Sequence, residues 1–580
     1  MPPKKRIPPA DPQPANPKSE RQPATTHKPV AAKKPAIATP RAAGKNVAVK
    51  VKKVAIEGKP AADGASEAPK PPARRKPGAA KPTTTAAESA APLSILMVVS
   101  EAHPFAKTGG LAEVAGALPD ALARLGHRVT LVLPRYRGVD AGDSTSEHLS
   151  FHLGDRTQHV VFHTRQVRDG VTAVLVDAPE LFDRDGLYNS GGVDFQDNAW
   201  RFAVLSRAAL DYARMRGDRP SVIHAHDWQT GLLPVYQKTH FPNDPVVGGV
   251  PVVFTIHNLA FQGVFPSGSL RVIGLGWDVF TMNALEYWDQ ISYLKGGINF
   301  SERITTVSPS YAREILTPEM GFGLEGTLQR RAADLSGILN GIDVQRWDPG
   351  NDEFLPAPYG PHDFSGKTRA KQVLLETVGL PADAGAMARP VIGLVSRLSD
   401  QKGFDLIGSA IGPLTALDAA WVMLGSGERH YEANWRFMAS VNPARFAATI
   451  GFNERLAHLI EAGADIFLMP SRFEPCGLGQ MIAMCYGSAP IVRATGGLAE
   501  TVEEGPPFQP RTGFVFGPYE PGALQDAVLR ALDSYSRPAE WRMLMRNGMC
   551  ADHSWRRSAR AYVNLYRQAL VLHRGLDLPR

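Results

Sequence analysis

The sequence predicts an α/β protein with two Rossmann-like, doubly wound domains that face each other across a cleft, preceded by a disordered basic arm. Three observations support this fold class. Short apolar runs alternate with helical patterns from residue 93 onward, which is typical of parallel α/β sheets. The runs are too many for one sheet with a single switch point, and a polar stretch rich in Pro and Gly at residues 346–385 divides them into two sets.

The N-terminal arm, residues 1–92, differs in composition from the rest of the chain. Residues 1–90 contain 19 Lys and Arg against 6 Asp and Glu, 17 of the 48 prolines, and no Phe, Trp or Tyr. Such a segment cannot bury enough apolar surface to offset backbone ordering at roughly 1–2 kcal/mol per residue, so we expect disorder. Its charge permits weak contacts with a polyanion; the alternative is a solvated appendage without a specific partner. The remaining 490 residues carry 45 basic and 51 acidic side chains, so the formal net charge of +7 comes from the arm.

Composition also excludes several classes of protein. No apolar run approaches the ~18 residues that a membrane-spanning helix needs, so we expect no membrane association. The basic start at residues 4–6 is followed by prolines rather than by the apolar core of a secretory signal. Three cysteines, Cys476, Cys485 and Cys550, cannot form an even disulfide framework. We therefore expect a reducing, cytoplasmic location.

The expected elements follow one another in an alternating order. A nearly continuous apolar run at residues 93–99 predicts a buried parallel strand, and a helical pattern at 111–125 follows it. Further strands are expected in the first domain (93–345) at 129–133, 171–176, 221–224, 251–256 and 304–307, and in the second domain (346–555) at 391–395, 420–424, 464–469 and 489–492. A last helical pattern at 558–572 lies in a C-terminal segment, 556–580, that we expect to return to the first domain. Since ligands of such sheets bind outside the carboxyl ends of the strands, motifs at strand ends should face the cleft.

The first motif, Lys107-Thr108-Gly109-Gly110, lies between the first strand and its helix. Two glycines that open a helix let backbone N–H groups approach an anion, and the helix N-terminus adds about half a positive charge. Lys107 adds a full charge. The order differs from a Walker A loop, in which Lys and Thr follow the glycines. The alternative is a tight strand-to-helix turn with an exposed lysine.

A second basic pair, Arg397 and Lys402, follows the strand expected at 391–395. A planar guanidinium and a point charge together suit the two phosphates of a nucleotide diphosphate. The turn Gly425-Ser426-Gly427 follows the next strand on the same edge. Two such cations are usually solvated surface charges, and their interest comes from their place beside the expected cleft.

The third motif is the segment from Ser471 to Gly479, which contains Glu474 and follows the strand expected at 464–469. We interpret Glu474 as a carboxylate that hydrogen-bonds sugar hydroxyls. The alternative is a capping role at the start of the next helix. Downstream, Thr495-Gly496-Gly497 repeats the arrangement of two glycines before a helix, which indicates another phosphate or ribose contact.

The fourth motif, His224-Ala225-His226-Asp227, ends a strand, and His257-Asn258 ends its neighbour. A zinc site is one interpretation, but no further ligand has characteristic spacing. We expect instead that one imidazole hydrogen-bonds a substrate hydroxyl and that the other is a satisfied core residue, so no metal is predicted.

Together these motifs resemble those of bacterial glycogen synthases and plant starch synthases, which are retaining glucosyltransferases of the GT-B type. The resemblance covers about residues 95–570, and the long N-terminal arm is the one departure from the family's usual length. Four motifs stand in the family's order: Lys107-Thr108-Gly109-Gly110-Leu111; His226-Asp227-Trp228; Ser396-Arg397-Leu398 with Gln401-Lys402-Gly403; and Arg472-Phe473-Glu474-Pro475-Cys476-Gly477-Leu478.

The resemblance implies a substrate pair and a role for each residue. The donor is expected to be ADP-glucose and the acceptor the non-reducing end of an α-1,4-glucan such as glycogen, with ADP released and no cofactor required. Lys107 is expected on the donor phosphate, Arg397 and Lys402 on the departing diphosphate, His226 near the glucose hydroxymethyl, and Glu474 on the ring hydroxyls. Further substrate contacts are expected from Thr108, Gly109, Gly110, Asp197, Asn198, Asn258, Cys476, Gly477, Leu478, Thr495, Gly496 and Gly497.

No carboxylate nucleophile can be identified for a double displacement, which favours attack by the acceptor on the face that the diphosphate leaves. Fixed cations in a closed cleft would stabilise the charge that develops on the diphosphate. Two rivals remain: a transferase of the same architecture that uses UDP-sugars, and a polyanion-binding protein in which the basic arm dominates.

Overall fold

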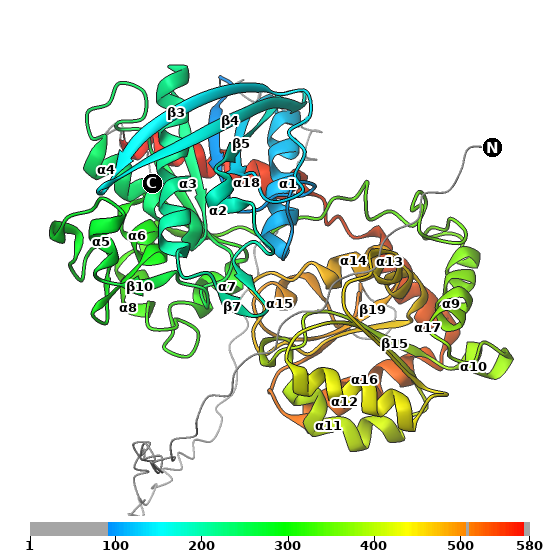
Figure 1. Cartoon of the computed structure of the whole chain (residues 1–580). Helices are drawn as coiled ribbons and strands as arrows, with labels where there is room; N and C mark the ends of the chain where they lie inside the picture. Colours follow the sequence, from blue (N-terminus) through cyan, green and yellow to red (C-terminus); the bar gives the residue numbers. More distant parts are fainter. Residues whose placement is uncertain (1–90, 506–509, 574–580) are drawn as a thin grey trace, which may run out of the picture. The chain divides into compact units, whose positions relative to one another are not determined.

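The computed structural model describes residues 91–505 and 510–573, which fold around two parallel sheets (Figure 1). This arrangement confirms the predicted α/β fold with two doubly wound sheets. The disordered arm predicted for residues 1–92 lies outside the described residues, apart from its last two.

The first sheet has nine strands in the order β14-β13-β9-β8-β1-β2-β5-β4-β3. All neighbours are parallel except in the β3–β4–β5 meander at one edge. The strand order reverses between β1 and β8, so the loops after these two strands border the switch point. The strands are β1 (Ser94–Val98), β2 (Arg128–Pro134), β3 (Thr145–Leu153), β4 (Arg156–Arg168), β5 (Val171–Asp177), β8 (Val222–His226), β9 (Val252–Ile256), β13 (Arg303–Thr306) and β14 (Leu335–Gly337).

The second sheet has six parallel strands in the order β17-β16-β15-β18-β19-β20, and its switch point lies between β15 and β18. The strands are β15 (Val391–Val395), β16 (Ala420–Gly425), β17 (Phe446–Ile450), β18 (Ile466–Met469), β19 (Ala489–Arg493) and β20 (Phe514–Phe516). The four predicted motifs follow β1, β8, β15 and β18, and they therefore border the two switch points.

The remaining elements cover the sheets or extend their loops. Two small antiparallel sheets belong to the first domain: β6 (Asn189–Ser190) with β7 (Val193–Asp194), and β10 (Val264–Pro266) with β11 (Glu286–Tyr287) and β12 (Gln290–Ser292). The α-helices are α1 (Gly110–Arg124), α2 (Pro179–Phe182), α3 (Asn198–Arg216), α4 (Leu232–His240), α5 (Ser269–Val272), α6 (Tyr293–Phe300), α7 (Pro309–Glu314), α8 (Glu325–Arg330), α9 (Ser365–Thr377), α10 (Ala384–Ala388), α11 (Phe404–Ala416), α12 (Arg429–Val441), α13 (Glu454–Gly463), α14 (Gly479–Cys485), α15 (Leu498–Thr501), α16 (Pro521–Tyr535), α17 (Pro538–Cys550) and α18 (Trp555–His573).

The structure contains several elements that the sequence did not predict, among them the strands β14, β17 and β20 of the two large sheets. The stretch 346–385, expected to be a polar connection, contains α9, whose buried Ala370 and Leu374 pack against α13. Its charged residues conceal this narrow apolar stripe in the sequence. The hairpin β3–β4 was not predicted either, because β3 lies at the sheet edge and exposes many of its side chains.

Two segments connect the sheets, and they run side by side. The backbone N–H of Ile342 donates to the carbonyl oxygen of His553 at 2.8 Å, just before α18. Helix α18 then packs against α1, and the Tyr566 hydroxyl lies 2.8 Å from Nδ1 of His224 at the end of β8. The first sheet is therefore packed against both an early and the final described helix of the chain (Figure 1).

Within the described ranges, no helix combines the length and the apolar content that crossing a bilayer requires.

A buried lysine joins three elements of the second domain. The Lys367 ammonium on α9 donates to the carbonyl oxygens of Ala462, Ala464 and Tyr486 at 2.8–3.0 Å and to the Ser488 hydroxyl at 3.0 Å. These acceptors lie at the end of α13, beyond it, and in the turn before β19. Since each carbonyl would otherwise lose a hydrogen bond inside the protein, the ammonium holds α9 against the sheet.

Replacing Lys367 with Met tests this contact. The variant keeps the approximate length of the side chain but removes these buried hydrogen bonds, so we expect the free energy of unfolding to fall by about 2 kcal/mol or more. Calorimetric unfolding measures the change. Lys238→Met, which removes an ion pair with Glu302 from a lysine that is 40% exposed, is the matched control and should change stability by less than about 1 kcal/mol. Equal effects of the two substitutions would contradict this role.

Candidate active site

The loop between β1 and α1 is fixed by a buried carboxylate. Glu101, which is 3% exposed, accepts hydrogen bonds from the backbone N–H and the hydroxyl of Thr108 at 2.5 and 2.8 Å. Residues 107–110 are thereby held at the surface with Gly109 at the N-cap of α1. Lys107 extends from this loop, and its ammonium lies 2.5 Å from Oε1 of Glu113 on the first turn of α1.

Positive charge from both domains acts on Glu101. Burial raises the pKa of this carboxyl, while the two hydrogen bonds from Thr108 and the charges of Lys107 and Arg397 oppose the rise. Lys107 belongs to the first domain and Arg397 to the second. The structure therefore brings the ends of β1 and β15 into electrostatic range of one another, as expected for motifs that border two facing switch points.

The Arg397 loop is packed closely against the turn after β16. Leu398 and Gly427 form a backbone bridge, and a Cβ on Gly427 would lie 2.2 Å from the carbonyl oxygen of Leu398. A Cβ on Gly425 would lie 1.9 Å from the carbonyl oxygen of Ser396. These glycines are needed for close backbone approach, which leaves the Arg397 side chain exposed at the strand end.

Glu474 is buried and paired with Lys402. Its Oε2 lies 2.6 Å from the Lys402 ammonium and 3.1 Å from the Ser471 hydroxyl, and the residue is 6% exposed. The next helix, α14, begins at Gly479 and has no side-chain cap, so Glu474 does not cap it. The capping alternative is therefore excluded for this structure, and Glu474 and Lys402 form one charged unit between the ends of β15 and β18.

The turn Thr495-Gly496-Gly497 presses against the Glu474 loop. A Cβ on Gly496 would lie 1.9 Å from the carbonyl oxygen of Glu474, and one on Gly497 would lie 2.3 Å from that of Cys476. The N–H of Gly496 donates to Oε1 of Glu314 on α7 of the first domain at 2.8 Å, and the Thr495 hydroxyl lies 3.3 Å from the same oxygen. The donors expected to bind a phosphate or ribose here hold a carboxylate.

A second carboxylate makes the reverse contact between the same two helices. Glu500 on α15 accepts a hydrogen bond from the backbone N–H of Ser310 in the first turn of α7. The hydroxyl of Ser308 donates to the carbonyl oxygen of Pro475 at 2.6 Å. Helix α7 of the first domain is thus bonded to both loops that surround Glu474.

Two histidines at the end of β8 have different surroundings. His224 is satisfied by the Thr255 hydroxyl at 2.6 Å and by Tyr566. Nδ1 of His226 lies 2.9 Å from Nε2 of His257, whereas its own Nε2 is buried without a hydrogen-bond partner among the described residues. Burial lowers the pKa of His226 well below its usual value and that of His224 and His257 to about 3, so all three imidazoles are neutral near pH 7. His224 is therefore a satisfied core residue, and the expected contact of the other imidazole with a substrate hydroxyl stays a prediction for His226.

Asp227 adopts a strained backbone conformation beside His226. Its φ of 57° lies in the left-handed region, and its Oδ1 accepts a hydrogen bond from the N–H of His257 at 2.7 Å. Burial raises the pKa of Asp227 to about 7, against the effect of the backbone hydrogen bonds. The residue fixes the connection between the ends of β8 and β9.

Other predicted residues are engaged within the protein. Asp197 forms an ion pair with Arg184 at 2.6 Å, and Asn198 is buried, donating to the carbonyl oxygen of Tyr188 and accepting from Arg201. Asn258 accepts a hydrogen bond from the N–H of Ala260.

The segment after Glu474 contributes packing rather than free polar groups. Cys476 is buried, and burial raises the pKa of its thiol to about 12. Gly477 has a φ of 74°, and a Cβ on it would lie 2.4 Å from Oε1 of Gln480. Leu478 lies across the interface from Gly110, whose Cβ position is 3.9 Å from Cδ1 of Leu478.

Four charged residues that organise the site were not predicted from the sequence: Glu101, Glu113, Glu314 and Arg346. The Arg346 guanidinium lies 3.1 Å from Glu113 and 2.5 Å from Glu454, so it links α1 to α13. Only Glu101 left a signal, since a carboxylate directly after a buried strand is unusual. Glu314 and Arg346 have their partners more than 100 residues away in the chain, and the same holds for the contact of Glu113 with Arg346.

Among residues 91–505 and 510–573, no three His, Cys, Asp or Glu side chains are arranged to hold a metal ion. The absence of a metal from the site stays a prediction.

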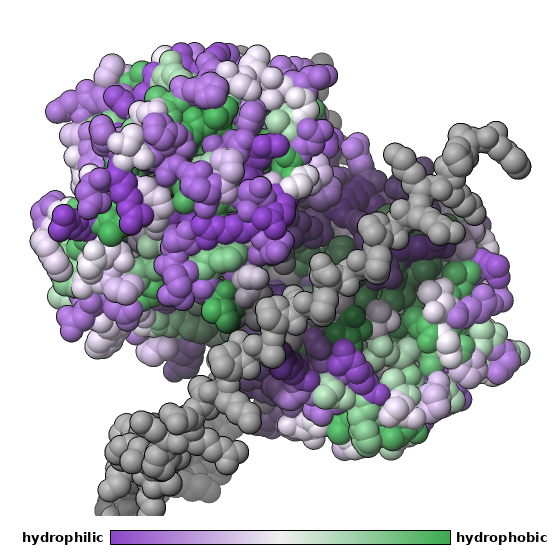
Figure 2. All heavy atoms as spheres, viewed as in Figure 1, coloured by the Kyte–Doolittle hydropathy of each residue, from purple (hydrophilic) through white to green (hydrophobic). Residues whose placement is uncertain are grey.

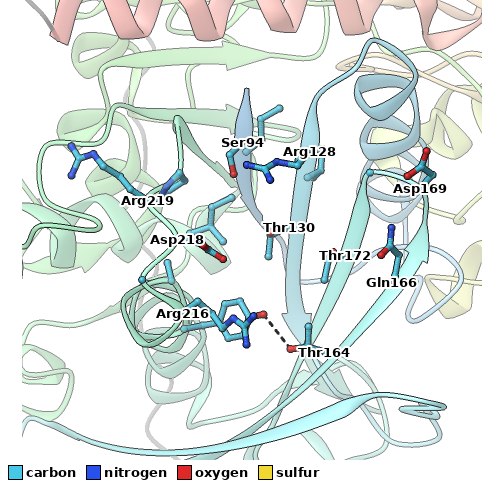
Figure 3. A pocket seen from close by; sticks show the side chains of 18 residues that line it. Ser94, Arg128, Thr130, Thr164, Gln166, Asp169, Thr172, Arg216, Asp218 and Arg219 are labelled. Carbon is cyan, nitrogen blue, oxygen red and sulfur yellow. Dashed lines mark hydrogen bonds between the residues drawn. The ribbon is translucent and has the colours of Figure 1, made fainter. Parts of the chain in front are cut away.

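A cavity of about 550 Å³ lies at the other end of the first sheet (Figure 3). It is lined by the starts of β1, β2 and β5 and by the end of α3, with Arg128, Arg216 and Asp218 around it. The Thr164 and Tyr212 hydroxyls are 3.2 Å apart in its wall. None of the predicted site residues lines this cavity, which is remote from the carboxyl ends of the strands.

Two doubly wound domains with opposed cations and a neutral histidine at their switch points define a glycosyltransferase of the two-Rossmann-domain class. Residues 94–330 match the family described as starch synthase catalytic domain, and residues 389–534 match glycosyl transferases group 1. The glycogen synthase of Anaeromyxobacter dehalogenans is 49% identical over 476 residues, which cover 82% of this chain and 99% of that protein. The chain belongs to the family of bacterial glycogen synthases and starch synthases.

Solved structures agree with this assignment. The catalytic domain of starch synthase IV from Arabidopsis thaliana, bound to ADP and acarbose, has a TM-score of 0.76 and 32% identity, covering 83% of this chain and 100% of that one. Sucrose-phosphate synthase from Thermosynechococcus elongatus has a TM-score of 0.53 at 18% identity, covering 83% of this chain and 100% of that one. The second similarity shows only that the fold is shared.

Replacing Asp227 with Asn isolates one effect of pH on stability. Since the folded pKa is about 7 and the usual value is 3.8, the folded protein holds a proton across this window that the unfolded chain releases. The carboxyl therefore contributes stability that is present below pH 3.8 and is lost as the pH rises through about 7. We expect the free energy of unfolding of the variant, relative to the wild type, to increase between these pH values in urea titrations.

The imidazoles of His224, His226 and His257 have lowered pKa values, so they make the free energy of unfolding rise with pH. Because they are present in both the wild type and the variant, this effect largely cancels when the two free energies are subtracted. Asp183→Asn, at an exposed carboxylate paired with Arg137, is the control and should give a nearly constant difference. A constant difference for Asp227→Asn as well would contradict the raised pKa.

Proposed function

We propose that the protein transfers glucose from ADP-glucose to the non-reducing end of an α-1,4-glucan such as glycogen, with retention of configuration, and releases ADP. The observation that carries the proposal is that the motifs of the two domains meet: Leu478 lies 3.9 Å from the Cβ position of Gly110, and α7 is hydrogen-bonded to the loops around Glu474. The family membership supports the reaction class, and the ADP and acarbose bound by the Arabidopsis relative support a nucleotide-sugar donor and a glucan acceptor.

The proposal divides the work between the domains. Residues 93–345 would bind the acceptor, residues 346–555 would bind the nucleotide sugar, and residues 556–580 would return to the first domain. We place the reaction in the cytoplasm, consistent with three free cysteines. Polyanion contacts through residues 1–90 stay a prediction, because these residues lie outside the described structure.

The cations would act on the leaving group. Cleavage of a glycosyl–phosphate bond develops negative charge on the diphosphate, so fixed positive charges lower the barrier when they bind that charge more tightly than the ground state. Arg397 is exposed at its strand end and free to turn toward a diphosphate. Lys107 and Lys402 are held by Glu113 and Glu474 and would share their protons with the phosphate oxygens.

His226 and Glu474 would bind the sugar. The Nε2 atom of His226 is buried without a partner and belongs to a neutral imidazole, which suits a hydrogen bond to the glucose hydroxymethyl. Glu474 has a second carboxylate oxygen for the ring hydroxyls while Oε2 holds Lys402. Both groups are fixed before substrate arrives, so little ordering is needed on binding.

The remaining assignments are weaker contacts. Thr495 and the N–H of Gly496 would meet the diphosphate or ribose once Glu314 is displaced from them, and Gly497 would complete this turn. Asn258 and Asp197-Asn198 would contribute to the sugar or acceptor side. The loop residues Thr108, Gly109 and Gly110 would flank the phosphate, and Cys476, Gly477 and Leu478 would shape the wall opposite.

We propose that the acceptor attacks on the face from which the diphosphate departs. A double displacement would require a carboxylate nucleophile beside the anomeric carbon. The carboxylates at the switch points are already committed, Glu101 to Thr108, Glu474 to Lys402 and Asp227 to the N–H of His257. Same-face attack also keeps water from the reacting centre when the cleft closes.

Substituting the three cations tests the electrostatic role. We expect Lys107→Ala, Arg397→Ala and Lys402→Ala each to lower kcat by roughly a hundredfold or more, because each removes a contact made to the developing charge. Steady-state rates with ADP-glucose and glycogen measure the effect. Lys238→Ala and Arg389→Ala are matched controls, since their ion pairs lie away from the switch points. Near-normal turnover in all three variants, with Tm unchanged, would exclude this account.

Comparing donors tests the identity of the nucleotide sugar. With a glycogen primer, we expect kcat/KM for ADP-glucose to exceed that for UDP-glucose by at least about tenfold, which corresponds to about 1.4 kcal/mol of differential binding. Release of labelled nucleoside diphosphate measures both rates under identical conditions. A preference for UDP-glucose, or transfer to a small acceptor but not to glucan, would favour the rival transferase.

A further inference from the structure

The hairpin between β11 and β12 ends in an unusual turn. Tyr287 pairs with Gln290, so Trp288 and Asp289 form a two-residue connection. Both have positive φ, 51° and 60°, which is the type I′ geometry that favours Asn-Gly. A bulky tryptophan is a poor residue for this position, and folding therefore tolerates a local strain to keep it there.

The strained turn exposes the indole ring. Trp288 is 77% exposed, whereas an aromatic side chain of this size is normally buried or packed against a partner. The turn does not need the ring for its own packing. An exposed tryptophan held in a strained turn indicates a contact with something outside the domain.

The hairpin is joined to the active site by a short series of contacts. The Tyr287 hydroxyl donates to the carbonyl oxygen of Phe322 at 2.8 Å, and the Phe322 ring packs against Phe473, with centroids 5.4 Å apart. Phe473 precedes Glu474. The hairpin also belongs to the connection that leaves the carboxyl end of β9 and enters α6, on the same edge of the sheet as His226.

Strain of this kind clusters on that edge. Among the described residues, four that are not glycine have positive φ: Asp227, Trp288, Asp289 and Phe322. Asp227 adjoins His226, and Phe322 contacts the Glu474 loop. Backbone strain persists where the surrounding structure or a function requires it, which connects the turn with the site rather than with the remote surface.

The residues of the Trp288-Asp289 turn indicate which kind of ligand it binds. Trp288 is followed by Asp289, whose N–H donates to Oε1 of Glu286 at 3.2 Å, so the turn that carries the ring also carries two carboxylates. These charges disfavour nucleic acid or an anionic membrane. A glucose ring offers a face of C–H groups for the indole and a rim of hydroxyls for the carboxylates. A second protein would need roughly 800 Å² of contact, far more than one side chain supplies.

We propose that Trp288 is a stacking platform for the glucan polymer, holding a chain segment beyond the reacting end. The platform rests on the proposed function, because it presumes a glucan acceptor. It gives the first domain a second contact with a polymer whose end lies in the cleft, which raises the local concentration of chain ends at the site.

The test uses the full-length protein and Trp288→Asn. Asparagine is favoured at this φ, so the variant should keep or raise Tm. We expect its affinity for glycogen, measured without donor by affinity electrophoresis, to fall about fivefold or more, the effect of losing one aromatic contact. KM for glycogen should rise in parallel at similar kcat and should rise less for maltotriose. Trp288→Phe should recover most of the affinity.

A matched control comes from the second domain. Phe437 on α12 is 62% exposed in a region where hydrophobic residues are visible on the surface (Figure 2). Phe437→Gln removes an exposed aromatic ring of similar accessibility and should leave glycogen affinity and KM unchanged.

Two results would overturn the platform. One is glycogen affinity and KM in Trp288→Asn equal to the wild type. The other is a change of oligomeric state in size-exclusion chromatography without glucan, which would assign the ring to a second copy of the chain. Failure of the proposed function is distinguishable, because it would abolish transfer from ADP-glucose in the wild type, whereas the binding measurement needs no donor.

Discussion

The site depends on cations held in readiness by carboxylates at the ends of two parallel sheets. Glu113 holds Lys107, Glu474 holds Lys402, and Glu101 is influenced by both Lys107 and Arg397. Lysines in a cleft without such partners would repel one another and bind adventitious anions. With these carboxylates, the lysines are fixed in position and the site has little net charge. The lysines can then bind a more highly charged anion when it enters the cleft.

Sequence periodicity and strand-end position were sufficient for the framework of the fold. The buried strands beginning at Ser94, Val391 and Ile466 are apolar runs that any parallel sheet would need, and the motifs after them had to meet at an edge. Helix α9 was missed because two of its buried positions are Lys367 and Lys371, which interrupt the apolar period. The hairpin β3–β4 was missed because the edge strand β3 exposes many of its side chains.

Some residues of the candidate site could also be predicted from the sequence, and others could not. Lys107, His226, Arg397 and Glu474 stand at strand ends and could be found from their places in the chain. Glu314 could not, because its role comes from Gly496, which is 182 residues away, and nothing in the sequence near either residue indicates the other. The glycines at 496 and 497 allow a close backbone approach that the sequence did not reveal, since a Cβ at either position would meet the backbone of the Glu474 loop.

The paired connection between the domains has a mechanical consequence. Because the segments at Ile342 and His553 are hydrogen-bonded to each other, the chain crosses between the sheets as a double strand rather than as a single flexible tether. Rotation of one sheet relative to the other must therefore carry both crossings of the chain along together.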